Sequence, residues 1–382
     1  MKKLLLLLII APVLGFGQSL TLQDLTPLPE DFLSLLTTST DGQNIIINCG
    51  ESPQDYIFLY KYSTENDSWN TITTNPSLKK LRYANGEIIN NNLYRFNGRN
   101  GNGELEIIDL DSGDVSYGSN NPKPVSEGGS AVNGNNIYVF GGNLNGEYSN
   151  KFYYYNIIFD SWTELPNMPE AKNTRGEFIN KKLYVIGGYN GNVSNKIDVY
   201  NTETNSWENQ YVMPFAVSAH STAVFDNKIY IISDYSEMTR IVIFDTTNIS
   251  YTNVETNNMK PRRHSDSEII NDKLYLICGN NTSSASGGGW LNNIQSADLS
   301  SLLSLSKIDN TSITIYPNPT TSILTIDGNK EYQIKVYDLL GNKVLETQGN
   351  SINMAHLSTA TYIVKATDKS NNEEMTYRVV KN

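Results

Sequence analysis

The stretch Tyr138-Val139-Phe140-Gly141-Gly142 returns 46 residues later as Tyr184-Val185-Ile186-Gly187-Gly188. A hydrophobic strand ending in such a turn occurs six times, and the turns end 44 to 48 residues apart, at Gly50, Gly98, Gly142, Gly188, Asp234 and Gly279. An aromatic residue follows five of them about twenty residues later, at Trp69, Tyr117, Trp162, Trp207 and Tyr251. A fixed period near 45 residues is typical of a stacked repeat array.

Each repeat predicts one antiparallel sheet of four short strands. In the fourth repeat we expect strands over residues 176–180, 182–186, 196–200 and 206–209, separated by Asn, Gly and Asp turns. The glycine pairs let the backbone turn sharply, and each tryptophan is large enough to fill the space between neighbouring sheets. Tight turns without helical periodicity argue against βα units. The six repeats therefore predict six blades of a β-propeller.

The repeat resembles the kelch family over residues 20–300. The resemblance rests on a tyrosine and a glycine pair at the second strand, then a tryptophan followed by Leu-Pro and Met-Pro, as at Trp162, Leu165-Pro166 and Met168-Pro169. Three repeats depart from the glycine pair, with Asn97-Gly98, Ser233-Asp234 and Cys278-Gly279. A WD-type propeller would require Gly-His and Trp-Asp pairs, which this sequence lacks. The expected fold class is all-β, a six-bladed kelch-type β-propeller followed by a small immunoglobulin-like β-sandwich.

The sixth repeat lacks its aromatic outer strand. Near the N-terminus, residues 20–29 (LTLQDLTPLP) imitate the outer strand and following turn of the third repeat, residues 161–166 (SWTELP). An unpaired edge strand invites aggregation. We therefore predict that residues 20–29 pair with the sixth blade and close the ring.

The N-terminus has the pattern of a secretory signal peptide over residues 1–17. A short positive segment, Met1-Lys2-Lys3, precedes an apolar run and the small residues Gly15-Phe16-Gly17. The predicted domains are the signal peptide (1–17), the propeller (18–300), a linker (301–310) and a C-terminal module (311–382). No later segment approaches the roughly 20 apolar residues of a membrane-spanning helix, so we expect no membrane span in the mature chain.

Composition excludes some partners. The chain has 29 basic and 40 acidic residues and a formal net charge of −11, which repels phosphate backbones and argues against nucleic acid as a partner. Only two cysteines are present, so no disulfide framework is expected. Cys49 and Cys278 occupy corresponding places in the first and sixth repeats, and we expect two buried thiols because the two backbones are too far apart for a bridge.

The last seventy residues predict seven short strands, over residues 313–316, 323–326, 332–337, 343–347, 351–353, 362–366 and 375–380. Their motifs resemble the type A C-terminal sorting domain of the type IX secretion system, and the residues that carry the match are Tyr316, Pro317, Asn318, Pro319, Asp338, Gly341, Lys343, Tyr362, Val379, Val380 and Lys381. One departure is Ala360, where the family usually has glycine.

The resemblance to the sorting domain implies a route and a partner. It implies a Gram-negative bacterium of the Bacteroidetes type, signal-peptide-dependent export to the periplasm, and passage across the outer membrane. The implied partner is the type IX secretion machinery, which would engage residues 311–382. The protein would then be secreted or attached to the outer cell surface, with the domain removed. An ordinary immunoglobulin-like stalk is the alternative interpretation of this module.

Acidic residues recur seven positions before the marker tyrosine of alternate repeats, at Glu87, Glu177 and Glu268. Inner strands line the central channel of a propeller, so these carboxylates are candidates to bind a cation or a sugar. Arginines near the same strand starts would assist them, namely Arg82, Arg175, Arg262 and Arg263. The alternative is an ion pair between blades, because buried acids need a partner.

Two histidines, His220 and His264, open the inner strands of the fifth and sixth repeats. Six-bladed kelch proteins include sialic acid mutarotases, a resemblance that implies acid/base residues in the channel, with Glu177, Arg175 and His220 as candidates. A kelch-type copper oxidase would need a cysteine crosslinked to tyrosine, for which the sequence offers no suitable loop. No metal-ligand spacing, phosphate loop or serine elbow occurs, so no cofactor or metal is expected.

The leading hypothesis is a binding module for an unknown protein or glycan ligand. Loops rich in Asn, Gly, Ser and Tyr, such as residues 143–150 and 189–195, supply adaptable hydrogen bonding around aromatic contacts. The alternative is a carbohydrate-active enzyme, a sugar mutarotase or epimerase that uses the acidic channel residues. Ordinary hairpin turns have the same composition.

Overall fold

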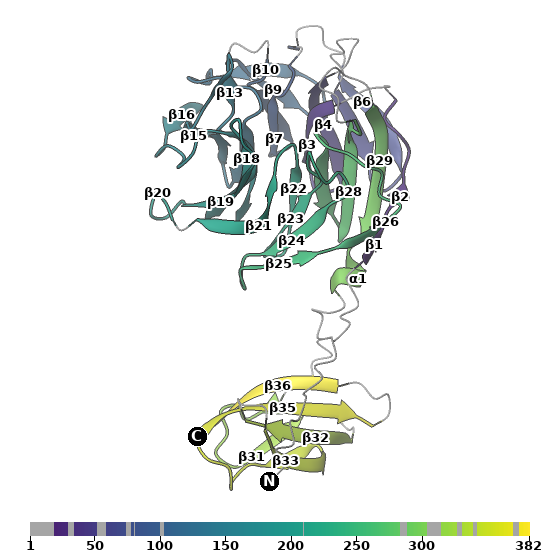
Figure 1. The fold of residues 1–382 in the computed structure, drawn as a ribbon, viewed down its shortest axis with the longest axis vertical. Coiled ribbons are helices and arrows are strands. Elements are labelled where there is room, and N and C mark those ends of the chain that lie inside the picture. The colour runs from purple at the N-terminus through teal and green to yellow at the C-terminus, as the bar shows by residue number, and fades with distance from the viewer. Residues whose placement is uncertain are drawn as a thin grey trace, which may run out of the picture. The chain divides into compact units, whose positions relative to one another are not determined.

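The computed structural model describes residues 19–29, 34–51, 59–73, 78–79, 81–99, 103–208, 210–282, 289–303, 315–326, 331–338, 342–369 and 374–382 (Figure 1). The chain divides into two compact units, Met1–Leu302 and Leu303–Asn382. The predicted signal peptide, residues 1–17, lies outside the described residues, as do Gly341 and the side chain of Cys49.

The first three repeats each form a four-stranded antiparallel sheet, as their alternating pattern predicts. The first sheet is β3 (Ser34–Thr40), β4 (Asn44–Glu51), β5 (Leu59–Ser63) and β6 (Ser68–Thr73). The second is β7 (Asn85–Ile89), β8 (Asn92–Phe96), β9 (Leu105–Asp109) and β10 (Val115–Gly118). The third is β11 (Gly129–Asn133), β12 (Asn136–Phe140), β15 (Phe152–Asn156) and β16 (Ser161–Glu164), and the hairpin β13 (Asn143–Leu144) and β14 (Glu147–Tyr148) extends from it.

The next three repeats follow the same plan. The fourth sheet is β17 (Asn173–Ile179), β18 (Lys182–Tyr189), β19 (Ser194–Asn201) and β20 (Ser206–Trp207), with the additional strand β21 (Tyr211–Val217) paired to β19. The fifth is β22 (Ser221–Phe225), β23 (Lys228–Ile232), β24 (Ile241–Asp245) and β25 (Ser250–Asn253). The sixth has only β27 (Asp266–Ile270), β28 (Lys273–Asn280) and β29 (Trp290–Asp298) from its own repeat.

The first strands of these sheets contact one another in cyclic order. Contacts run from β3 through β7, β11, β17, β22 and β27, and β27 returns to β3. The molecule is therefore all-β, and we interpret the six sheets as the blades of a propeller with the first strands innermost. Buried aliphatic and aromatic side chains fill the space between neighbouring sheets, in separate clusters that each draw on adjacent repeats.

The glycine turn brings each sheet close to the next. Gly141 and Gly142 have φ of +66° and +96°, and a Cβ on Gly141 would lie 2.4 Å from the carbonyl oxygen of Lys172 in the next repeat. Where the first glycine is replaced, Asn97, Ser233 and Cys278 still adopt positive φ, between 50° and 66°. The departures from the glycine pair therefore keep the same left-handed turn.

One strand from the N-terminus completes the sixth sheet, and another forms a separate pair beside it (Figure 1). β2 (Gln23–Asp24) pairs antiparallel with β29, and β1 (Ser19–Thr21) pairs in parallel with β26 (Glu255–Asn257). Leu20 and Leu22 are buried in the cluster between the fifth and sixth sheets. This is the pairing that residues 20–29 were expected to make.

Hydrogen bonds from tryptophan side chains show that the N-terminal segment occupies the position of an outer strand in the sixth sheet. Trp162 donates from Nε1 to the carbonyl of Ser119 in the preceding repeat, and Trp207 donates likewise to Pro166. Trp69 makes the same bond, 3.0 Å long, to Thr26. A residue near the N-terminus thus takes the place that a residue after the outer strand takes elsewhere.

The C-terminal unit contains two sheets around one core. The first has β30 (Ile315–Tyr316), β31 (Ile323–Ile326) and β34 (Ser351–Asn353), and the second has β33 (Lys343–Gly349), β32 (Tyr332–Tyr337), β35 (Ala360–Asp368) and β36 (Glu374–Lys381). Eleven buried residues form its core. The short helix α1 (Ser300–Leu303) lies at the start of the predicted linker, but its Leu302 packs into the core of the first unit.

Replacing both Leu20 and Leu22 by alanine tests the closure. Each leucine is at most 2 % exposed, and a buried Leu→Ala substitution costs about 2–5 kcal/mol. We expect the double variant of the full chain to unfold at a clearly lower temperature in a thermal melt. The matched control is Thr21→Ala, because Thr21 lies between the two leucines and is exposed. Equal melting temperatures for all three proteins would show that the N-terminal strands do not hold the ring.

Candidate functional site

The three predicted glutamates line one cavity. Glu87, Glu177 and Glu268 lie on β7, β17 and β27 and border a cavity of about 350 Å³ that all six inner strands enclose. We call this cavity the channel. Asp266 and Arg175 also line it. The alternate-repeat spacing thus brings all three acids together, as the position of the inner strands predicts.

Each glutamate is paired with a hydroxyl of the following repeat, and not with a cation. Glu177 Oε1 accepts a 2.7 Å hydrogen bond from Thr222, and Glu268 Oε1 accepts one of 2.8 Å from Thr38. Ser130 is the corresponding hydroxyl beside Glu87. Among the described residues, none of the three glutamates forms an ion pair. The alternative prediction of a salt bridge between blades is therefore wrong: the partner in the adjacent sheet is a hydroxyl group and not a cation.

The channel favours the neutral form of its acids. Removal from water raises the pKa of Glu87 to about 8 and that of Glu177 to about 7, and the neighbouring Asp266 adds to both shifts. Desolvation also raises the pKa of Glu268 and of Asp266. A carboxylic acid with a pKa near neutrality is able to give or take a proton.

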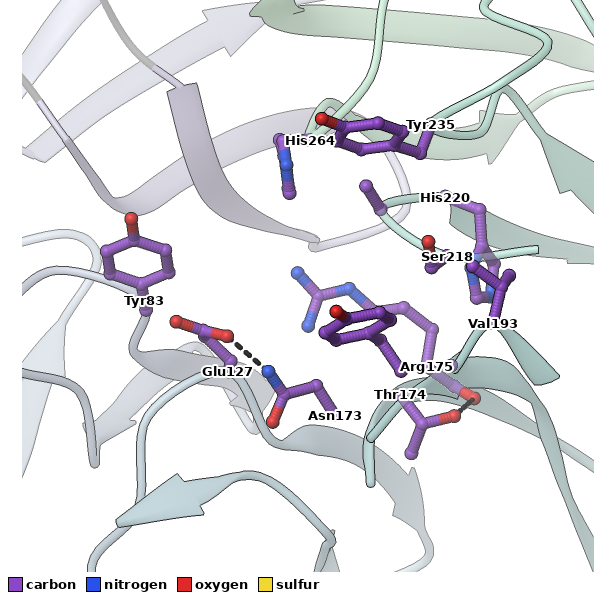
Figure 2. A pocket seen from close by; sticks show the side chains of 13 residues that line it. Tyr83, Glu127, Asn173, Thr174, Arg175, Val193, Ser218, His220, Tyr235 and His264 are labelled. Carbon is purple, nitrogen blue, oxygen red and sulfur yellow. Dashed lines mark hydrogen bonds between the residues drawn. The ribbon is translucent and has the colours of Figure 1, made fainter. Parts of the chain in front are cut away.

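A second cavity, of about 500 Å³, lies where the inner strands begin; we call it the mouth pocket (Figure 2). Arg175 lines both cavities and so connects the mouth pocket with the channel. The other lining residues come from the second to the sixth repeats and are Tyr83, Glu127, Asn173, Thr174, Gly188, Tyr189, Val193, Ser218, Ala219, His220, Tyr235 and His264.

Two repeat positions supply the rim of the mouth pocket. The first position lies fifteen residues before the end of the glycine turn, as Glu127 lies before Gly142. In successive repeats, the residues at this position are Tyr83, Glu127, Asn173, Ala219 and His264. The other directly follows the turn and supplies Tyr189 and Tyr235. Of these residues, the sequence had indicated His264 as a candidate and Tyr189 as the start of a candidate binding loop, residues 189–195. The register of the repeat was the signal that would have found the rest.

The first of these positions has an unusual backbone. Tyr83, Glu127, Ala219 and His264 all have left-handed φ, between 49° and 60°. Such conformations are sparsely populated for residues with side chains and collect at binding sites. The left-handed residue ends each connection between sheets and places its side chain at the start of the inner strand.

Arg175 extends into the middle of the mouth pocket (Figure 2). Its Nη1 donates a 3.2 Å hydrogen bond to the carbonyl of Gly128, and within the described chain it forms no ion pair. The nearby Glu127 is already occupied, because it pairs with Arg99 at 3.1 Å and accepts a hydrogen bond from Asn173. The guanidinium therefore keeps donors available to a ligand.

Both predicted histidines line the mouth pocket and not the channel. His220 is 4 % exposed, and neither of its ring nitrogens has a hydrogen-bond partner of good geometry among the described residues, although it lies near the carbonyl of Ile186. Burial lowers the pKa of His220 and of His264 to about 3, and Arg175 adds to both shifts. Both rings are neutral at physiological pH and offer one donor and one acceptor each.

The other predicted arginines do not reach the channel. Arg262 is fully buried and donates to the Cys278 carbonyl and to Gln295 Oε1, so its role is to hold the sixth sheet together. The Cζ atom of Arg263 lies 4.1 Å from the ring centroid of Tyr235. The backbone of Arg82 forms an antiparallel β-bridge with that of Arg99 in the same repeat. Cys278 is buried and free, as expected.

The fold and its cavities define a repeat protein of the propeller class with a ligand-sized pocket at one end of its channel. A family model described as the KLHDC2/KLHL20/DRC7 Kelch-repeats domain matches residues 36–234, just over half of the chain, and the chain therefore belongs to the kelch-repeat family. A second model, the secretion system C-terminal sorting domain, matches residues 314–382. Both resemblances seen in the sequence are confirmed. No curated protein matches the chain.

These matches place the protein outside the cell or on its surface, with the secretion machinery as a partner of the sorting domain. Most of the sorting-domain motif lies in strands or turns of the C-terminal unit, and Tyr362 and Val379 are buried in its core. The described part of the chain contains no helix with the length and hydropathy to cross a membrane.

Glu87→Gln tests the neutral state of the channel acids. Because folding raises the pKa of Glu87 from about 4.5 to about 8, its ionisation opposes folding increasingly as pH rises through this window. We expect the variant to gain stability relative to wild type between pH 4.5 and 8, on the order of 2 kcal/mol. Urea unfolding at a series of pH values measures the difference.

The control for this prediction is Glu164→Gln. Lys151 holds the pKa of exposed Glu164 below its usual value. The wild type should therefore be slightly more stable than this variant near neutral pH, and it should lose that extra stability only as the pH falls below about 4.5. A Glu87→Gln difference that stays constant from pH 4.5 to 8 would contradict a raised pKa.

Proposed function

We propose that this secreted or surface-attached kelch protein is a recognition module that binds a glycan in the mouth pocket. The observation that carries the proposal is the composition of this cavity, in which partly exposed tyrosines surround an available arginine and two neutral histidines. Small-ligand sites are concave, and aromatic walls with a few polar groups are typical of them.

A sugar suits this chemistry. Tyr189 and Tyr235 are 41 % and 45 % exposed, so their rings are available to pack against the flat face of a sugar. Ser218 and the partly exposed His264 offer a hydroxyl and an imidazole group for its hydroxyls. A protein partner would be expected to need a broader surface than a cavity of about 500 Å³. This supports a glycan over a protein ligand.

One observation favours an enzyme as the second candidate function. Glu177 has a pKa near 7 and lies close enough to Arg175 for that charge to lower its pKa, and Arg175 links the channel to the mouth pocket. A sugar bound at the mouth would have this proton donor below it. The activity would be a sugar mutarotation or epimerisation, with Glu177 as acid and base.

Glycan-array binding by the full mature chain tests the proposed recognition. We expect Tyr189→Ala to reduce binding at least several-fold, because it removes one aromatic wall, and Glu177→Gln to bind as wild type does. Tyr117→Ala is the matched control, since Tyr117 is also exposed but does not line the pocket. Mutarotation of bound sugars is followed by NMR on the same proteins. A turnover present in wild type and lost in Glu177→Gln would favour the enzyme, and an array without any bound glycan would reject the recognition proposal.

We further propose that a signal peptide takes the chain to the periplasm and that residues 311–382 then direct it across the outer membrane. Deletion of residues 311–382 should leave the protein in the periplasmic fraction, whereas the full chain reaches the surface or the medium. Tyr189→Ala, which leaves the sorting domain intact, is the control for export. Normal export of the truncated chain would refute this role of the domain.

A further inference from the structure

The mouth pocket continues into a groove. A neighbouring cavity of about 600 Å³ shares Glu127, Asn173 and Tyr189 with it and extends to the hairpin β13–β14. Tyr148 on this hairpin packs edge to face on Tyr189, with ring centroids 6.1 Å apart. Leu144 at the hairpin turn is 47 % exposed. The aromatic pair therefore forms the boundary between a deep pocket and an open groove, which gives room for a ligand of more than one unit.

Charge differs between the pocket and the groove. Arg175 faces the pocket with one hydrogen bond and no ion pair in the described chain. The carboxyls behind it in the channel favour their neutral forms, because desolvation raises the pKa of Glu177 and of Asp266. Glu127, on the boundary, is paired with Arg99. Arg175 is therefore a cation at the pocket that no ion pair in the described chain compensates.

A guanidinium with available donors selects a planar anion. Its parallel N–H groups match the two oxygens of a carboxylate, and such bonds are about twice as strong as neutral ones. Ser218 lines the same cavity and offers a neutral hydroxyl to the same ligand unit. The groove, in contrast, offers Asn143, Asn145 and the Tyr148 ring. Its charged residues, Arg99 and Glu127, pair with each other, so the groove suits an uncharged unit.

Resting on the proposed glycan recognition, we propose that the ligand is the end of an acidic glycan. Its terminal, carboxylate-bearing sugar occupies the mouth pocket with the carboxylate on Arg175. The next sugar lies in the groove against Tyr148 and Tyr189. The site therefore recognises chain ends that carry a uronic or similar sugar acid, and neutral chain ends bind weakly.

Calorimetric titration of the full mature chain tests this assignment. The probes are glucuronic, galacturonic and N-acetylneuraminic acids, disaccharides that carry each acid at the non-reducing end, and the neutral sugars glucose, galactose, cellobiose and lactose. We expect at least one acid to bind at least tenfold more tightly than the neutral sugars. Its disaccharide should bind more tightly than the single sugar, because only the disaccharide reaches the groove.

Two variants separate the two parts of the site. Arg175→Met should weaken binding of the acid about 10- to 100-fold and leave any neutral-sugar binding unchanged. Tyr148→Ala should remove the advantage of the disaccharide and leave the single acid unaffected. Arg175→Lys keeps the charge without the paired donors and should recover only part of the affinity. Lys181→Met, which removes an exposed cation outside both cavities, is the control for a general charge effect.

The outcomes distinguish this inference from the proposed function. Neutral sugars that bind as tightly as the acids, or an Arg175→Met variant that binds the acids normally, would overturn the acidic ligand and leave glycan recognition standing. A chain that binds none of these sugars but does bind a peptide with a free C-terminal carboxylate would overturn both.

Discussion

The left-handed turn that follows the second strand in the second to sixth repeats is the constraint on which the rest of the structure depends. The amide of Gly98 donates 2.8 Å to the carbonyl of Val125, and that of Gly142 donates 2.9 Å to Lys172, in each case in the segment that enters the next sheet. A Cβ on Gly141 would occupy the space of that segment. The turn therefore fixes where the next inner strand begins, and with it the rim of the mouth pocket.

The fold could be predicted from the sequence because this constraint repeats. Strands recur at one period, and the sixth repeat lacks the outer strand that this period requires. Residues 20–29 were therefore predicted to supply it, and the carbonyl of Thr26 accepts the hydrogen bond from Trp69 Nε1. The strand β21 was missed because its sequence contains Pro214, which favours a turn when only local pattern is considered. Its pairing with β19 depends on tertiary contacts that local sequence does not encode.

The site could be predicted only in part, and the reason is the direction of side chains. The three glutamates occupy the same position in three inner strands, seven residues before the repeat tyrosine, so their common location was visible. Four of the rim residues, Tyr83, Glu127, Ala219 and His264, precede the strands in left-handed conformations, where alternation no longer indicates direction. His220 and His264 were therefore assigned to the channel, whereas the turn directs them into the mouth pocket. The hydrogen-bond donors of Glu268 and Glu177, Thr38 and Thr222, could not be predicted either, because the spacing of residues does not specify which side chains meet across adjacent sheets.

The placement of the buried ion pairs and of the channel acids explains how an acidic chain presents a cationic pocket. The second and fourth sheets hold the buried ion pairs Arg95–Glu106 and Lys172–Asp198, at 2.6 and 2.8 Å, each satisfied within or beside its own sheet. The channel acids instead accept hydrogen bonds from hydroxyls of the first and fifth sheets, and desolvation raises their pKa. Neither arrangement consumes Arg175. Because burial is costly for an unpaired charge, the channel shifts its acids toward the neutral form, while Arg175 opens onto the mouth pocket and forms no ion pair in the described chain.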